Sequence, residues 1–246
     1  MARRRAAETS RSLPPILLSG LGVQYDLRLS KKRKLRDTVI RDGRHSKTGR
    51  FWALRDVNLR IDAGESVAVI GPNGAGKSTM LQVLAGILEP STGVVEVRGK
   101  IATLLQLGAG FDPELNAREN ILLVGEFLGV PHEEMVRRLP AILEFADLGE
   151  FADAEVRTYS AGMRARLGFS VATSVEPDVL LLDEVLSTGD AAFIEKSRGR
   201  IMELMKRARA IVFVTHDLDS AATFCTRAIE LEGGRVVADG PAKPVI

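Results

Sequence analysis

Residues 67–81 read VAVIGPNGAGKSTML, which is the most informative pattern in the chain. Its first four residues are apolar on both faces, which is typical of a strand buried in a parallel sheet. A loop with three glycines follows, and apolar residues then recur at helical spacing: Leu81, Leu84, Leu88. The pattern predicts a strand, a glycine-rich loop and a helix, in that order.

A loop of this composition is suited to binding phosphate. Glycines allow consecutive backbone N–H groups to converge on one anion, and the helix N-terminus adds a partial positive charge. The amine of Lys77 is expected to reach the β- and γ-phosphates of a nucleotide, and the hydroxyl of Ser78 to ligate Mg²⁺. The predicted phosphate-binding residues are Gly71, Pro72, Asn73, Gly74, Ala75, Gly76, Lys77, Ser78 and Thr79.

Length and composition indicate a soluble globular protein. With 246 residues, 45% hydrophobic and 27% charged, the chain is long enough for one sizeable core with a subdomain. We expect neither a membrane helix nor a signal peptide, because the apolar runs are far shorter than a bilayer span. The single cysteine, Cys225, excludes an intramolecular disulfide, so a reducing cytoplasm fits.

Charge is distributed unevenly along the chain. Residues 26–50 hold ten Lys or Arg against three Asp, and residues 1–12 hold four Arg against one Glu. Together these two stretches have a net charge of +10. The net charge of the whole chain is +2, so the remaining residues have a net charge of −8. Such asymmetry usually marks contact with an anionic surface or ligand. Residues 1–12 are expected to be a disordered lead, and residues 26–50 a basic insert.

Hydrophobic periodicity predicts an α/β fold. Residues 16–23 and 53–61 are expected to be strands of an antiparallel β region, because residues 53–61 alternate between apolar and polar side chains. Further strands are predicted at residues 94–97, 101–105, 179–183, 210–215 and 228–231, and helices at 119–128, 133–148, 161–174 and 193–207. A helical excursion inserted into a phosphate-loop core is the simplest description.

Two carboxylates end the apolar strand predicted at residues 179–183. Because side chains alternate along a strand, Asp183 and Glu184 cannot do the same job. We expect Asp183 to face the magnesium site and Glu184 to be aimed at the attacking water. A strand ending in Asp-Glu is weak evidence alone, and becomes strong downstream of a phosphate-binding loop.

The segment Tyr159-Ser160-Ala161-Gly162-Met163 opens a predicted helix and narrows the family. It resembles the Leu-Ser-Gly-Gly-Gln signature of the nucleotide-binding subunits of ABC transporters, keeping Ser160 and Gly162. The resemblance covers residues 25–240 in order and spacing. It implies a P-loop NTPase domain of ABC type at residues 13–246, with an antiparallel β region and a helical subdomain at about 112–175. Read without that context, Ser160 is a plain helix N-cap.

The resemblance also implies roles for other residues. Ser160 and Gly162 would cap the γ-phosphate of ATP held by a second copy of the chain, so the active form would be a homodimer with two ATP. Gln106 is similar to the glutamine that senses magnesium and couples to the membrane partner, and His216 to the histidine that binds the γ-phosphate. Ser187 and Asp190 match a loop that makes dimer contacts. Tyr25 is expected to stack on adenine, with Phe51 and Trp52 as competitors.

Several departures from the general pattern resemble one branch of the family, the ATPases that export lipid-linked polysaccharides. They are Tyr-Ser-x-Gly-Met at 159–163, Leu-Gly-Ala-Gly-Phe at 107–111, Arg-Glu-Asn-Ile at 118–121 and Gly-Asp-x-x-Phe-x-x-Lys at 189–196. Members of this branch move O-antigen, teichoic acid or galactan. Typical members have Glu where Gln106 stands, which weakens the coupling role of that side chain. The chain is expected to be a short form without a C-terminal carbohydrate-binding domain.

The resemblance implies a peripheral ATPase at the cytoplasmic face of the cell membrane, bound to a polytopic permease. The basic insert would contact anionic headgroups or the pyrophosphate of a lipid-linked glycan, unless it is simply a solvated loop. The alternatives are a soluble ABC ATPase acting on ribosomes or nucleic acid, and the ATPase of another transporter class such as an importer or a drug-efflux system. No nucleic acid is expected as a partner. Soluble ABC ATPases that act on ribosomes usually have two ATPase cassettes in one chain, those that act in DNA repair have long coiled coils, and this sequence shows neither feature.

Overall fold

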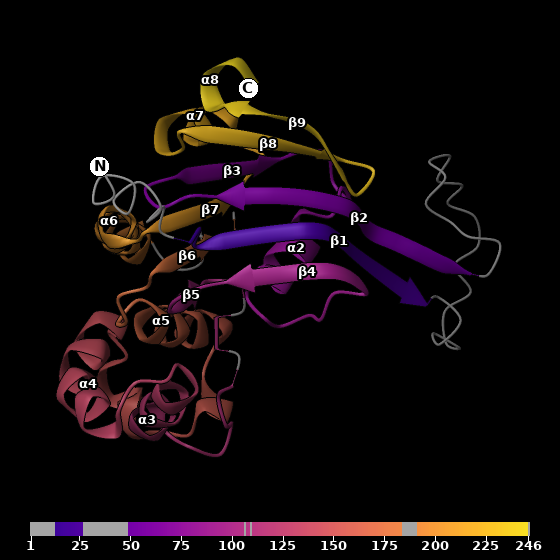
Figure 1. Cartoon of the computed structure of the whole chain (residues 1–246). Coiled ribbons are helices and arrows are strands. Elements are labelled where there is room, and N and C mark those ends of the chain that lie inside the picture. Colours follow the sequence, from indigo (N-terminus) through magenta and orange to yellow (C-terminus); the bar gives the residue numbers. More distant parts are fainter. Residues whose placement is uncertain (1–12, 27–48, 106, 109, 184–190, 246) are drawn as a thin grey trace, which may run out of the picture.

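The computed structural model describes residues 13–26, 49–105, 107–108, 110–183 and 191–245. Within these ranges, two β-sheets lie next to each other, and three helices form a separate group at one end of the molecule (Figure 1). Each predicted helix and strand is present in the predicted order, with bounds that differ by a few residues. The strand Arg235–Pro241, the helices Leu218–Phe224 and Ala242–Val245 and two short 3₁₀ helices were not predicted.

The smaller sheet is antiparallel and has the order β2-β1-β4, formed by β1 (Ile16–Asp26), β2 (Arg50–Ile61) and β4 (Thr92–Val97). In β2 the apolar residues are buried and the intervening polar ones are exposed, as the alternation predicts. All three strands contain a residue with positive φ: Gly20, Asp56 and Gly93. The register of β1 shifts against both neighbours near Gly20, which is a bulge that bends the sheet.

The larger sheet contains six strands in the order β5-β6-β7-β3-β8-β9. Their bounds are β3 (Ser66–Ile70), β5 (Ile101–Thr103), β6 (Val179–Leu182), β7 (Ala210–Val214), β8 (Arg227–Glu232) and β9 (Arg235–Pro241). The first five strands in that order run parallel, but β9 pairs antiparallel with β8. The sheet is therefore mixed, whereas we had predicted a parallel one. Gly233 and Gly234, both at positive φ, make the two-residue hairpin turn that returns the chain.

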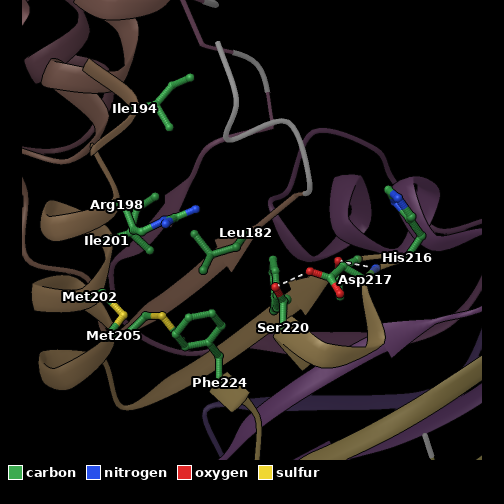
Figure 2. A pocket seen from close by; sticks show the side chains of 12 residues that line it. Leu182, Ile194, Arg198, Ile201, Met202, Met205, His216, Asp217, Ser220 and Phe224 are labelled. Atoms are coloured by element: carbon green, nitrogen blue, oxygen red, sulfur yellow. Dashed lines mark hydrogen bonds between the residues drawn. The ribbon is translucent and has the colours of Figure 1, made fainter. Parts of the chain in front are cut away.

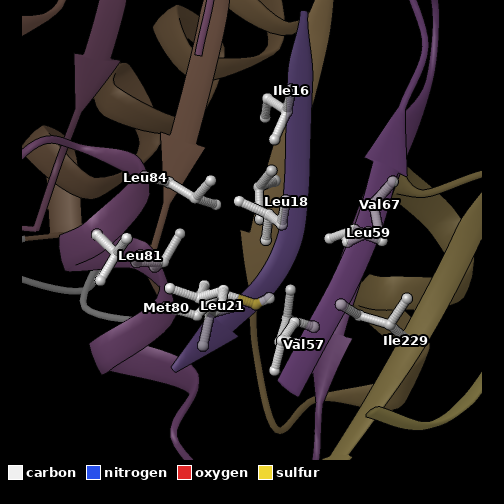
Figure 3. Packing of buried hydrophobic residues seen from close by; sticks show 14 of the residues in the cluster. Ile16, Leu18, Leu21, Val57, Leu59, Val67, Met80, Leu81, Leu84 and Ile229 are labelled. Atoms are coloured by element: carbon white, nitrogen blue, oxygen red, sulfur yellow. The ribbon is translucent and has the colours of Figure 1, made fainter. Parts of the chain in front are cut away.

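Side-chain alternation along the central strands divides the interior into two cores. In β3, Val67 and Val69 face the antiparallel sheet, while Ala68 and Ile70 face the opposite side. Helix α2 (Lys77–Leu84) fills the space between the sheets with Met80, Leu81 and Leu84 (Figure 3). The opposite face is covered by helices α6 (Ala191–Arg207), α7 (Leu218–Phe224) and α8 (Ala242–Val245). Both faces of the phosphate-loop strand are thus buried, which holds the loop that follows it in place.

A third core belongs to the group of three helices, α3 (Ala117–Phe127), α4 (His132–Ala146) and α5 (Ala161–Ala172). The short 3₁₀ helices η2 (Gly149–Asp153) and η3 (Val156–Thr158) lie between α4 and α5. Helix α3 begins with a capping box, in which Asn116 accepts from the Glu119 amide and Glu119 accepts from the Asn116 amide. These elements fall inside the stretch at about 112–175 that the sequence assigns to a helical subdomain.

Two residues of the Arg-Glu-Asn-Ile motif at 118–121 have clear structural roles. The buried Asn120 accepts a hydrogen bond from the Asp112 amide at 2.7 Å and donates to the carbonyls of Asp112, Leu115 and Asn116 at 3.0 Å. Arg118 pairs with Asp153 of η2 at 2.8 Å. The motif therefore fixes the loop that leads into α3.

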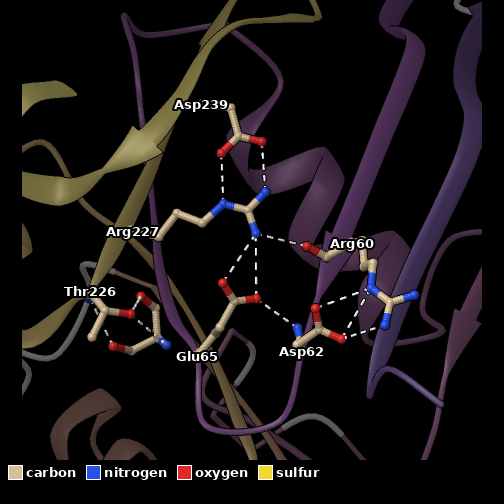
Figure 4. A network of polar contacts seen from close by, with 7 residues as sticks. Arg60, Asp62, Glu65, Thr226, Arg227 and Asp239 are labelled. Atoms are coloured by element: carbon tan, nitrogen blue, oxygen red, sulfur yellow. Dashed lines mark hydrogen bonds and ion pairs between the residues drawn. The ribbon is translucent and has the colours of Figure 1, made fainter. Parts of the chain in front are cut away.

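A polar network fastens the two sheets at the end away from the phosphate loop (Figure 4). Arg227 of β8 makes two hydrogen bonds of 2.7 Å to Asp239 of β9, and donates to the Arg60 carbonyl of β2 at 2.8 Å. Glu65 lies 3.4 Å from the same guanidinium. Hydrogen bonding to Asp239 raises the pKa of Arg227 further above its usual value, so this charge is permanent.

Candidate nucleotide-binding site

The loop between β3 and α2 adopts a conformation that requires glycine. Gly71, Gly74 and Gly76 have φ values of 137°, 79° and 110°. A Cβ on Gly71 would lie 2.1 Å from the Leu231 carbonyl oxygen, and one on Gly76 would lie 2.6 Å from the Ala53 carbonyl oxygen. The loop is therefore wedged between β8 and β2, and larger residues at these two positions would displace it.

The side chain of Lys77 binds the backbone at the start of the loop. Its Nζ donates hydrogen bonds to the carbonyl oxygens of Gly71 at 2.6 Å and Pro72 at 3.1 Å. Lys77 is also the first residue of α2, so the amine and the unpaired amides of the helix N-terminus lie together. An anion held there would meet both a full positive charge and the partial charge of the helix.

A cleft of about 620 Å³ opens over this loop. It is lined by the following residues: Tyr25, Phe51, Ala53, Asn73, Gly74, Ala75, Gly76, Lys77, Ser78, Thr79, Asp183 and Val214. Seven consecutive residues of the predicted phosphate loop line it, together with the ends of β6 and β7. Ligands of parallel α/β sheets bind at this carboxyl edge of the strands.

Two aromatic side chains stand at one wall of the cleft. Tyr25 of β1 and Phe51 of β2 are paired across the antiparallel sheet, and Tyr25 is 38% exposed. Trp52, the other competitor for stacking on a base, is not among the residues lining the cleft; its ring lies over Gly22. A planar base would therefore meet Tyr25 and Phe51.

Asp183 lines the cleft together with residues 73–79 of the phosphate loop. It is half-buried directly after β6 and lines the same cleft as the Ser78 hydroxyl. One hydroxyl and one carboxylate suit Mg²⁺, which keeps several waters and takes further oxygens from bound phosphates. Within the described ranges, His, Cys, Asp and Glu form no group of three that could hold a metal by themselves. The donor set fits a magnesium ion that arrives with a nucleotide.

His216, for which the resemblance implies a role at the γ-phosphate, does not line the cleft over the phosphate loop in this structure. It is exposed and lines a second cavity of about 490 Å³ between α6 and α7, instead of the cleft over the phosphate loop (Figure 2). Val214, two residues earlier, does line that cleft. Asp217 follows His216 and caps α7, accepting hydrogen bonds from Ser220 at 2.5 Å and the Asp219 amide at 3.1 Å. The bond from Ser220 is the main reason that the pKa of Asp217 is lowered.

Ser160, Ala161 and Gly162 of the signature segment are exposed, and no residue of the segment lines the cleft. Ser160 caps α5 by accepting a hydrogen bond from the Met163 amide at 3.2 Å, and Gly162 is exposed beside it. Tyr159 is buried, with its hydroxyl donating to the Phe151 carbonyl at 2.6 Å. Burial is the main cause of the raised pKa of this phenol. Ser160 and Gly162 are thus presented on the surface while Tyr159 anchors them.

Four predicted site residues lie outside the described residues, namely Gln106, Glu184, Ser187 and Asp190. Most of the basic insert and the expected disordered lead, residues 27–48 and 1–12, also lie outside them. The strands that flank the insert end at the paired residues Asp26 and Arg50, directly beyond Tyr25 and Phe51. Asp26 and Arg50, which lie on either side of residues 27–48 in the sequence, are therefore next to the aromatic wall of the cleft.

Sequence reasoning missed Gly168 of α5. A Cβ there would lie 2.4 Å from the Gly108 amide nitrogen and 2.8 Å from the Leu107 carbonyl carbon. Only glycine allows the helix that follows the signature segment to approach this backbone so closely. A glycine in a helix interior is a weak signal by itself, because its reason lies in a neighbour 60 residues away.

A buried strand, a glycine loop closed by lysine, a helix N-terminus and a carboxylate at the adjacent strand end define a P-loop nucleotide-binding domain. The ABC transporter family model matches residues 54–187, just over half of the chain, and the chain belongs to this family.

The curated relatives are named for polysaccharide export. The chain is 45% identical over 197 residues to the O-antigen export system ATP-binding protein RfbB of Klebsiella pneumoniae, covering 80% of each protein. It is 38% identical over 222 residues to the teichoic acids export ATP-binding protein TagH of Listeria innocua, covering 90% of this chain and 65% of the relative. These matches confirm the resemblance to the polysaccharide-exporter branch.

Solved structures agree with the fold. The chain matches the ATP-binding cassette MJ0796, a dimer in a post-hydrolysis state bound to ADP and Pi, with a TM-score of 0.69 and 26% identity. The match covers 92% of this chain and 98% of the cassette. An ATP-binding subunit of an ABC transporter gives a TM-score of 0.71 at 25% identity. The α/β fold of ABC type is confirmed.

Proposed function

We propose that the chain is the ATP-hydrolysing subunit of an ABC exporter that moves a lipid-linked polysaccharide across the cytoplasmic membrane. The observation that carries this proposal is the cleft over the phosphate loop, in a chain whose relatives are named for O-antigen and teichoic acid export. These names favour export over a soluble ATPase that acts on nucleic acid or ribosomes.

In the proposed site, ATP lies with its adenine against Tyr25 and its phosphates on residues 71–79. The loop amides and Lys77 would neutralise the phosphates, because the loop residues line the cleft and Lys77 stands at the N-terminus of α2. Ser78 and Asp183 would hold Mg²⁺, which supplies charge neutralisation at the β- and γ-phosphates when bound. Glu184 would accept a proton from the water that attacks the γ-phosphate in line.

The second half of the site is proposed to come from another copy of the chain. Ser160 and Gly162 are exposed and do not line the cleft of their own chain, which suits residues that act on a partner's ATP. Ser187 and Asp190 would make contacts across the dimer, and His216 would bind the γ-phosphate. The result would be a head-to-tail homodimer with two ATP at the interface. The dimeric structure of the similar cassette MJ0796 supports this proposal.

The proposed exporter also requires a membrane partner for this chain. No helix in the described part of the chain is long and apolar enough to cross a membrane. We therefore assign the translocation path to a polytopic permease, with this chain bound peripherally at the cytoplasmic face. Gln106 would couple ATP hydrolysis to that permease. The basic insert at residues 26–50 would contact an anionic membrane surface or the pyrophosphate of the glycan carrier.

The proposal is tested in cells depleted of this chain. A lipid-linked glycan should accumulate on the cytoplasmic side, and it should be exported again when the wild-type chain is supplied. The variant Lys77→Met, which retains a long side chain without the charge, should not restore export. Normal glycan export in depleted cells would refute the proposed function.

The basic insert has its own test. Neutralising the run at residues 31–34 should reduce export more than it reduces basal ATPase activity, because that run contains none of the predicted phosphate-binding or catalytic residues. Equal losses, or no loss at all, would rule out a membrane or carrier contact for the insert.

A further inference from the structure

Two residues of the motif Gly-Asp-x-x-Phe-x-x-Lys at residues 189–196, Phe193 and Lys196, have no part in the site described so far. Phe193 and Lys196 lie in the first turns of α6, the first described element after residues 184–190. Those seven residues hold the proposed base Glu184 and both proposed dimer contacts. Contacts that hold the first turns of α6 therefore also fix the position of Ala191, the residue that follows this segment.

Phe193 joins α6 to two helices of the helical group. Its ring is 5.8 Å from the rings of both Phe145 of α4 and Phe169 of α5, edge-on in each case. Phe145 and Phe169 stack on each other at 5.9 Å. Phe193 is 5% exposed, so three helices meet in one buried aromatic cluster.

Lys196, one turn later, binds the C-terminal end of α4. Its Nζ lies 4.5 Å from the centre of the Phe145 ring, and donates to the carbonyl oxygens of Glu144 at 3.4 Å and Phe145 at 3.3 Å. Carbonyls in the last turn of a helix have no partner within the helix and carry its partial negative charge. Lys196 therefore caps α4 from another element while stacking on its aromatic ring.

The signature helix is tied to the same cluster. Arg166 of α5 lies 5.8 Å from the centre of the Phe193 ring, and 3.6 Å from Asp147, which ends α4. Arg166 is six residues after Ser160 on the same helix. The orientation of Ser160 is therefore set by contacts that lead through α5 to α6.

We propose that Phe193 and Lys196 are positioning residues, which hold the signature helix of a chain in fixed orientation to α6 and to the sheet on which α6 packs. This rests on the proposed function, because the orientation matters when two chains close on two ATP. Each chain must then offer its cleft and its Ser160 in one relative position. If the contact is lost, the helical group occupies other orientations, and closing the dimer must select one of them.

The size of the effect is bounded by the contact itself. Loss of a cation–π contact at an exposed site changes the equilibrium constant that depends on it by about 2- to 5-fold. The dimer contains two such contacts, so losing both weakens ATP-driven dimerisation by about 4- to 25-fold. Binding of ATP to the cleft of a single chain stays unchanged, because neither residue lines it.

The experiment compares Lys196→Met, Lys196→Arg and Lys206→Met, each in a Glu184→Gln background that accumulates ATP-bound dimer. Methionine keeps the stem of the side chain and removes its charge, while arginine restores a cation that donates hydrogen bonds. Lys206 is exposed in the last turn of α6 and controls for the loss of a charge from that helix. Dimerisation constants at saturating MgATP and ATP affinities of the monomer are measured for each chain.

The expected result is weaker dimerisation for Lys196→Met alone, with recovery in Lys196→Arg and normal dimerisation in Lys206→Met. In the monomer, amide hydrogen exchange at the end of α4 should rise in Lys196→Met by about 2- to 5-fold. Unchanged exchange, unchanged dimerisation or an equal loss of monomer ATP affinity would overturn the assignment. If the Glu184→Gln parent itself remains monomeric, the proposed dimer fails, and this inference fails with it.

Discussion

Alanine at Gly168 should destabilise the protein, although alanine normally favours a helix. In the interior of an exposed helix, Gly→Ala stabilises by about 1 kcal/mol. At Gly168, however, the added Cβ would lie 2.4 Å from the Gly108 amide nitrogen and 2.8 Å from the Leu107 carbonyl carbon. Both are backbone atoms, so the conflict is relieved only by moving α5 away from that loop.

The expected magnitude is the difference between two terms. Overpacking costs about 1–3 kcal/mol, and a backbone neighbour places this site at the upper end. Subtracting the gain in helix propensity leaves a destabilisation of about 2 kcal/mol. For a chain of this size, that corresponds to a melting temperature lower by about 4–8 °C.

Gly199 of α6 supplies a matched control. It is exposed, and a Cβ there would meet no atom within 4 Å. Gly199→Ala should therefore raise the melting temperature by about 2–4 °C. Both variants are compared by thermal unfolding without nucleotide. A stabilisation by Gly168→Ala similar to that of Gly199→Ala would refute the close approach between α5 and residues 107–108.

Three further predictions concern single side chains. Lys77→Met should weaken ATP binding by about 10- to 150-fold, because a charge-assisted hydrogen bond to the phosphates is lost. Normal affinity by calorimetry would contradict the role of the amine. Burial raises the pKa of the Cys225 thiol to about 12, so alkylation at mildly alkaline pH should occur only in denaturant, and rapid labelling of the native protein would show the thiol to be accessible. Because the bond from Ser220 lowers the pKa of Asp217 below 3.8, its stabilising effect is present above that value and is lost as the pH falls through the lowered pKa. Urea unfolding of Asp217→Asn should then depend less on pH in this acidic range, and an unchanged dependence would exclude the carboxylate as its source.

The parts of the fold that could be predicted were those encoded in local patterns. The phosphate loop combines glycines, Lys77 and a buried strand within a few residues, so its strand, loop and helix were all located. The alternation in β2 likewise identified its buried face. Leu88 lies beyond the end of α2, because the chain leaves the helix at Ala85 and takes positive φ at Gly86.

What could not be predicted depends on contacts between distant residues. Strand β9 was missed although Gly233-Gly234 is a hairpin signal. Apolar and polar residues alternate only weakly along β9, and the strand is only partly buried. Helix α7 has seven residues, too few for periodicity to show. Phe193 and Lys196 were noticed only as marks of a family branch. Their partners, Phe145 and the end of α4, lie about 50 residues earlier and are identified only by the fold.

The ATP site is proposed to be shared between two chains, and substitution of Ser160 tests this arrangement. In a Glu184→Gln background with saturating MgATP, the chain should sediment as a dimer with two bound ATP. Adding Ser160→Arg should give a monomer that still binds one ATP with normal affinity, because Ser160 does not line the cleft of its own chain. A dimer that survives Ser160→Arg, or a monomer that loses ATP binding, would contradict the claim.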